Sequence, residues 1–120
     1  MSAAPTIVKD LNLKKDGKTP SLRDFHSQKQ PKEFAEHNAL FVYYLSKVKE
    51  LTGITPNHIY TCYKEVNQRV PGAFYQSLLD TTRRKGWLDT SNTEDIKVTT
   101  VGENFVEHDL PKKAEKDSGT

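Results

Sequence analysis

The chain has 120 residues, with 18 lysines and arginines against 16 aspartates and glutamates, so its formal net charge is only +2. Its single cysteine, Cys62, excludes an intramolecular disulfide, and no apolar run approaches the roughly 20 residues of a membrane-spanning helix. We therefore expect a cytoplasmic protein without a membrane partner. Its domain at 21–110 should lie between a flexible arm at 1–20 and a disordered tail at 111–120, both too polar to add to the core.

Three stretches before residue 70 have the features of helices. Ser21 can cap a short helix, and apolar residues that recur every three, four or seven positions from Phe34 onward predict a longer helix over 32–51. Thr55 and Pro56 are suited to the cap and first position of the next helix. These signals predict that most of the domain is helical.

A further helix is expected over about 73–85, after the turn RVPG and before Gly86. Glycine accepts the left-handed backbone conformation that commonly closes a helix, so Gly86 is the expected end of this one. Helical spacing groups four side chains on its buried side, namely Tyr75, Leu78, Leu79 and Thr82.

The last third of the domain predicts a hairpin and a short helix. Trp87 with Leu88 and the run IKVT at 96–99 indicate two strands around the polar loop DTSNTED. Thr100 and Glu103 have the spacing of a capping box for the final helix.

This order of elements resembles the winged helix-turn-helix superfamily. The resemblance is carried by TPNHIYTCYKEVNQ, by VPGAFYQSLLDTTRRKG and by KGWLDTSNTEDIKVTTVGENFV, within the region 32–108. It implies a mainly α fold, with a three-helix core, a two-stranded wing and a short C-terminal helix. In this superfamily the third helix most often enters the major groove of DNA, although many members bind proteins instead.

Seven polar residues at or near the helix over 73–85 are the candidate contacts to double-stranded DNA: Lys64, Arg69, Gln76, Ser77, Arg83, Arg84 and Lys85. Gln76 and Ser77 fall in its N-terminal half, where base contacts are usually made, and glutamine can bond adenine with two hydrogen bonds. The five cations can neutralise phosphates. Alternatively, the run Arg83 to Lys85 serves only to complement the dipole at the end of its helix.

Acidic residues oppose the DNA interpretation. Asp80 lies in the middle of the expected DNA-reading side, and Asp89, Glu94 and Asp95 make the expected wing acidic, which should repel a phosphate backbone. Two hypotheses therefore remain. The chain is either a DNA-binding protein with an accessory or regulatory role, or a protein-interaction module that uses the acidic hairpin or exposed aromatic residues.

Neither hypothesis requires catalysis, a cofactor or a metal. His58 and Cys62 share one side of a helix, as two metal ligands would, but no second pair stands at zinc-site spacing. The glycines are spread singly along the chain and form no phosphate-binding loop. We therefore expect a protein that is not an enzyme.

Overall fold

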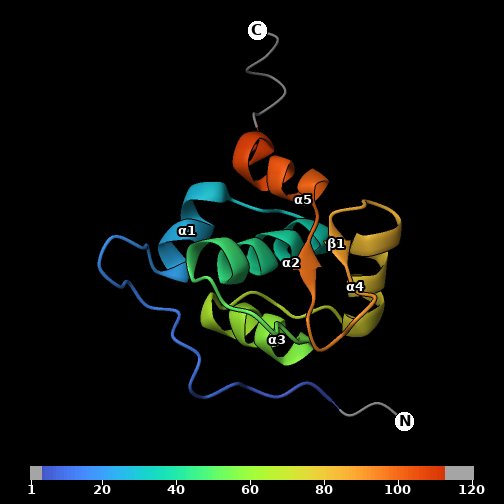
Figure 1. Ribbon diagram of the computed structural model, residues 1–120, viewed down its shortest axis with the longest axis horizontal. Coiled ribbons are helices and arrows are strands. Elements are labelled where there is room, and N and C mark those ends of the chain that lie inside the picture. Colours follow the sequence, from blue (N-terminus) through green and yellow to red (C-terminus); the bar gives the residue numbers. More distant parts are fainter. Residues whose placement is uncertain (1–3, 113–120) are drawn as a thin grey trace, which may run out of the picture.

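The computed structural model describes residues 4–112. In chain order its elements are α1 (Leu22–Lys29), α2 (Phe34–Tyr43), the π-helical turn η1 (Tyr44–Val48), α3 (Pro56–Glu65), α4 (Phe74–Arg83), β1 (Leu88–Asp89), β2 (Lys97–Val98), α5 (Thr100–Asn104) and the π-helical turn η2 (Phe105–Asp109). The predicted class, mainly helical with a small antiparallel hairpin, is confirmed. The layout in Figure 1 is compatible with a winged-helix-like arrangement.

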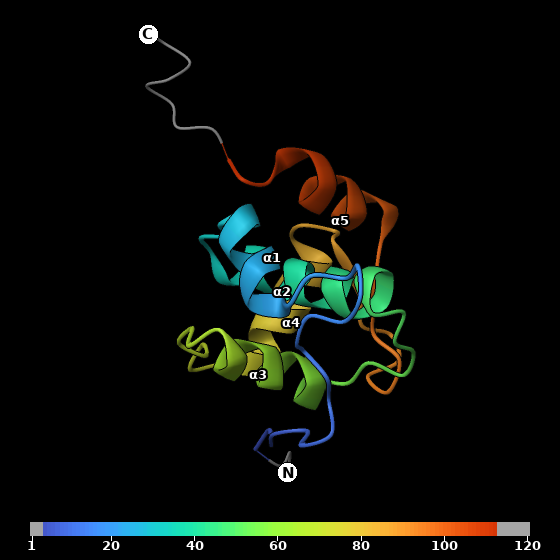
Figure 2. The same cartoon turned by 90° about the vertical axis from the view of Figure 1, so that its left-hand side faces the viewer.

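Helix α2 is the centre of the molecule. It contacts α3, α4, β2, α5 and η2, and these elements surround it in Figures 1 and 2. Every residue from 36 to 42 is buried. The prediction that Phe34 belongs to the buried stripe is wrong, because Phe34 is the first residue of α2 and is 40% exposed. The helical conformation also ends at Val48, before the predicted residue 51.

A polar network inside the core joins α2 to its neighbours. The Asn38 amide donates to the hydroxyl oxygens of Thr81 at 3.1 Å and Ser77 at 3.2 Å, both on α4. The Tyr63 hydroxyl of α3 donates to Asn38 Oδ1 at 2.7 Å. Buried polar groups are stable only when they are hydrogen-bonded, so this network fixes how α3 and α4 pack on α2.

The cap of α3 is confirmed, since Thr55 and Pro56 occupy the cap and first positions. The cap of α5 is Thr99 and not Thr100. Thr99 has an extended backbone, and its hydroxyl accepts from the backbone N–H of Gly102 at 3.1 Å. The predicted capping box therefore lies one residue too late.

The hairpin is fixed to the helices at both of its ends. Leu88 pairs with Val98, and the Trp87 ring stacks on Phe105 with ring centroids 3.9 Å apart. At the other end, the Ile96 N–H donates to the carbonyl of Ile54 at 2.8 Å, in the connection between η1 and α3. The wing-like element is therefore a part of the core and not a free flap.

The segment before α1 contributes to the core, contrary to expectation. Leu13 is only 4% exposed, and the Val8 N–H donates to the Thr61 hydroxyl at 2.8 Å. Figures 1 and 2 show this segment passing along α3. The apolar residues in IVKDLNL are a weak signal, because Lys9 and Asp10 interrupt them and two lysines follow directly.

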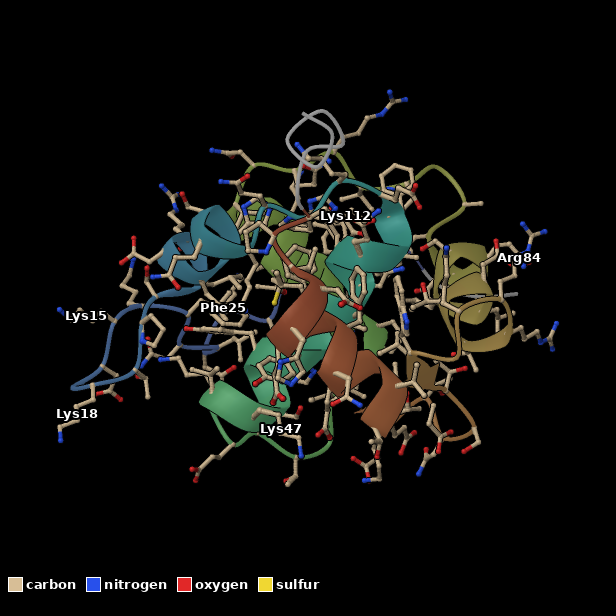
Figure 3. All side chains as sticks on the ribbon, turned by 90° about the horizontal axis from the view of Figure 1, so that it is seen from above. Lys15, Lys18, Phe25, Lys47, Arg84 and Lys112 are labelled. Carbon is tan, nitrogen blue, oxygen red and sulfur yellow. The ribbon has the colours of Figure 1, made fainter. Side chains whose placement is uncertain are left out.

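The expected tail at 111–120 lies mostly outside the described residues, but Lys112 is placed (Figure 3). Its ammonium group forms an ion pair with Glu36, which is 1% exposed. Burial alone would raise the pKa of this carboxyl, whereas Lys112 and the backbone N–H groups of Lys32 and Glu33 lower it overall. The end of the described chain therefore neutralises a buried charge at the start of α2.

Candidate nucleic-acid interface

Helix α4 turns a different face to the core than the sequence predicts. Its buried residues are Phe74, Leu78 and Thr81, so Gln76 and Arg83 lie at the centre of the exposed side. Leu79, which was predicted to be buried, is only half-buried. The helix is thus rotated by about a quarter turn from the predicted orientation. The hydroxyls that bond Asn38 explain the rotation, because an apolar pattern alone does not include them.

Ser77 is not on the exposed side of α4. Its hydroxyl donates to the carbonyl of Phe74 at 2.6 Å and accepts from the Asn38 amide. The first contact is within α4, and the second joins α4 to α2. Its expected position on the DNA-reading side of the helix is therefore wrong, because the side chain is used between the two helices.

Gln76 and Arg84 share one anionic partner on the exposed side. The Gln76 amide donates to Asp80 Oδ1 at 3.0 Å, and Arg84 Nε lies 3.9 Å from the same oxygen. Surface pairs of this kind on a helix contribute only about 0.2–0.5 kcal/mol. Asp80 therefore orients Gln76 weakly, and another hydrogen-bonding group can displace it at little cost.

Cations stand at both ends of α4. Arg83, Arg84 and Lys85 are exposed at its C-terminal end, and Figure 3 shows Arg84 pointing away from the body of the protein. Lys64 and Arg69 are exposed in and before the turn that leads into its N-terminal end. The ten residues of α4 rise about 15 Å, whereas Arg69 precedes the helix by five residues and Lys64 lies on α3.

The hairpin beside α4 is negatively charged. Hydrogen bonds from Ser91 hold the pKa of Asp89 below its usual value, and a hydrogen bond from Lys97 does the same for Asp95. Glu94 is exposed between them in the sequence. The lowered pKa values keep Asp89 and Asp95 ionised at neutral pH, and the surface changes sign between α4 and the hairpin.

Three histidines, His26, His37 and His58, and the single cysteine lie within the packed structure. His58 Nδ1 accepts from the Thr55 N–H at 3.0 Å, at the start of α3, and burial raises the pKa of the Cys62 thiol. His26 and His37 lie with ring centroids 5.2 Å apart, and burial lowers the pKa of both. Among residues 4–112, no group of three or more His, Cys, Asp or Glu side chains is placed to hold a metal ion.

Tyr43 and Tyr60 bear on the hypothesis that exposed aromatic residues contact another protein. The Tyr43 hydroxyl donates to Glu107 at 2.8 Å, and its ring stacks on Phe25. Tyr60 is half-buried, with its ring edge-on to Phe74 and Lys64 Nζ 5.9 Å from its centroid. Both rings therefore make most of their contacts within the molecule. The more exposed aromatic residues are Phe34 and Tyr75, at 40% and 37%.

The chain was compared with models of protein families, with curated proteins and with solved structures, and none of the three comparisons gave a match. Within residues 4–112, no helix is long and apolar enough to cross a bilayer.

Proposed function

We propose that the protein is a non-enzymatic DNA-binding protein with a winged helix-turn-helix fold, in an accessory or regulatory role, and that α4 enters the major groove. The observation that supports this most is the exposed side of α4, which carries Gln76 and Arg83 and continues into the exposed cations Arg84 and Lys85, while Lys64 and Arg69 are exposed in the chain before the helix. The major groove is about 12 Å wide and is bordered by phosphates on both sides. An exposed helix of about 15 Å with cations at its C-terminal end is suited to lie in that groove.

In this arrangement Gln76 leaves Asp80 and bonds a base edge, while Arg83 and Arg84 contact phosphates on one side of the groove. Lys64 and Arg69 contact the phosphates on the other side. The acidic hairpin stays away from the backbone. Because at most five cations take part, the affinity should fall with salt with a slope no steeper than about −4.5 on logarithmic axes.

The test is fluorescence anisotropy with a labelled 20-base-pair duplex at several salt concentrations. The wild type should bind at low salt, and Arg83→Ala/Arg84→Ala should weaken binding at least tenfold and make the salt slope shallower by about 2. Gln76→Ala should change the preference among duplexes and leave the slope unchanged, because the glutamine carries no charge.

Lys15→Ala/Lys18→Ala is the matched control, since it removes the same charge. Figure 3 shows these lysines at the opposite end of the molecule from Arg84. The control should bind nearly as the wild type does. An equal loss in the two double variants, or no binding at about 50 µM protein in low salt, would remove the proposal, because non-specific DNA binding is usually tighter than that.

A further inference from the structure

A small apolar groove lies between α4, the start of α3 and the hairpin. Its volume is about 170 Å³, and two threonines of the hairpin loop line it together with Pro56, Tyr75, Leu78, Leu79 and Ile96. None of these side chains is charged. Pockets for cofactors and small-molecule ligands usually measure about 300–1,000 Å³, so this groove fits a single large side chain better than a whole ligand.

The groove is held in shape by contacts on two sides of the hairpin. The Thr82 hydroxyl of α4 lies 3.0 Å from the Thr90 hydroxyl. The Gly53 N–H donates to Asp95 Oδ1 at 3.3 Å, next to the bond from Ile96 to Ile54. A site that is already formed loses little conformational entropy when it is occupied, which favours binding.

Charge on the hairpin side of the groove indicates what can occupy it. Residues 87–96 contain no lysine or arginine, and Asp89 and Glu94 are exposed there. The next cation along the chain, Lys97, is bound to Asp95 at 2.8 Å. An acidic edge of this kind repels the phosphates of nucleic acids and attracts a basic partner.

We propose that this groove docks a basic segment of a partner protein. One apolar side chain of that segment inserts beside Leu79, and lysines or arginines next to it pair with Asp89 and Glu94. An apolar anchor within a charged rim is the usual anatomy of a protein-docking site. The site does not depend on DNA binding, because the DNA contacts proposed above are other residues.

The test begins with selection of random dodecapeptides, displayed on phage, against the whole protein. Enriched peptides should carry an apolar residue flanked by lysine or arginine. The best of them, synthesised and labelled, should bind Leu79→Ser about tenfold more weakly than the wild type, because the anchor loses its apolar contact. Asp89→Asn/Glu94→Gln should also weaken binding and reduce its salt dependence.

Two controls match these variants. Val101→Ser removes an apolar side chain that is 57% exposed on α5, and Asp24→Asn removes an exposed carboxylate on α1. Both should bind the peptide as the wild type does. The Asp89→Asn/Glu94→Gln variant changes only exposed side chains, so it remains informative even if Leu79→Ser disturbs the fold.

Several outcomes would overturn the proposal. These are selection without enrichment, enriched peptides that are acidic, and binding that is indifferent to the variants. If sedimentation showed a dimer that Leu79→Ser dissociates, the occupant would be a second copy of the chain. If Leu79→Ser weakened duplex binding as much as peptide binding, the groove would belong to the DNA surface. Loss of DNA binding in Arg83→Ala/Arg84→Ala with unchanged peptide binding would separate the two proposals.

Discussion

Gly102 is the position where the packing of the hairpin on α5 can be tested most directly. A Cβ atom at this position would lie 2.3 Å from the carbonyl oxygen of Trp87 and 2.8 Å from Val98 Cγ2. Carbon atoms in contact are normally about 3.5–4.0 Å apart. The Trp87 carbonyl cannot easily move, because it accepts the Thr99 N–H at 2.9 Å.

Two effects of Gly102→Ala have opposite signs. Alanine is the better helix former by up to about 1 kcal/mol, so propensity alone predicts a more stable protein. Overpacking usually costs about 1–3 kcal/mol, and a clash with backbone belongs at the upper end of that range. We expect a net loss of roughly 2 kcal/mol. At about 4 °C for each kcal/mol in a domain of this size, the Tm should fall by about 8 °C.

Urea denaturation followed by the fluorescence of Trp87, the single tryptophan, measures the loss and reports on the affected contact. Gly72→Ala is the matched control, since nothing lies within 4 Å of a Cβ there and its φ is not in the left-handed region. This variant should be neutral or more stable by up to about 1 kcal/mol. A Gly102→Ala protein as stable as Gly72→Ala would refute the close approach of α5 to the hairpin.

Three further changes test other parts of the fold by chemical denaturation. Gly86→Val should lower the free energy of unfolding by roughly 1–3 kcal/mol, because Gly86 has φ +69° and a β-branched residue is strained there. An unchanged denaturation midpoint would mean that α4 does not end in a left-handed residue at Gly86. Asn38→Ala should cost about 1–3 kcal/mol by removing the acceptor of the 2.7 Å bond from Tyr63, and Tyr63→Phe in the same background should then add little. Burial lowers the pKa of His26 and His37 from 6.5, so the unfolded chain takes up protons below pH 6.5 that the folded protein does not. Stability should therefore fall from pH 6.5 to pH 5, less steeply in His37→Phe, and a flat profile in the wild type would count against the buried pair.

Local sequence signals were sufficient to predict most of the helices and strands of this fold. Thr55 and Pro56 mark the start of α3, and Gly86 has the positive φ expected after α4, where its N–H donates to the Thr82 carbonyl at 3.1 Å. The hairpin was found from two short apolar runs around a polar loop. Each of these features depends on a few neighbouring residues.

The orientation of α4 could not be obtained in the same way. Apolar spacing places Ser77 on the exposed side with Thr81 beside it, but Asn38, buried in α2, requires hydroxyl partners and draws both of them inward. A polar residue in the apolar run of α2 was the available signal. Its partners lie far along the chain, so only the tertiary structure identifies them.

The sequence predicts only those parts of the candidate surface that depend on neighbouring residues. The exposed cations at the ends of α4 depend on local sequence, and Arg83 and Arg84 are exposed as expected. The apolar groove combines residues of α3, α4 and the hairpin, so no single segment indicates it. Leu79 looks like a core residue in its own helix, and only the packing of the hairpin shows that it is half-exposed.

The ion pair between Glu36 and Lys112 sets a limit on how early the protein can finish folding during its synthesis. Helices α1 to α4 leave the ribosome before η2 and Lys112 do. Until then, the core position of Glu36 would hold a carboxylate without its cation, which is strongly unfavourable. The start of α2 therefore stays hydrated in the nascent chain, and the central helix reaches its final packing only when residue 112 has been added and has emerged.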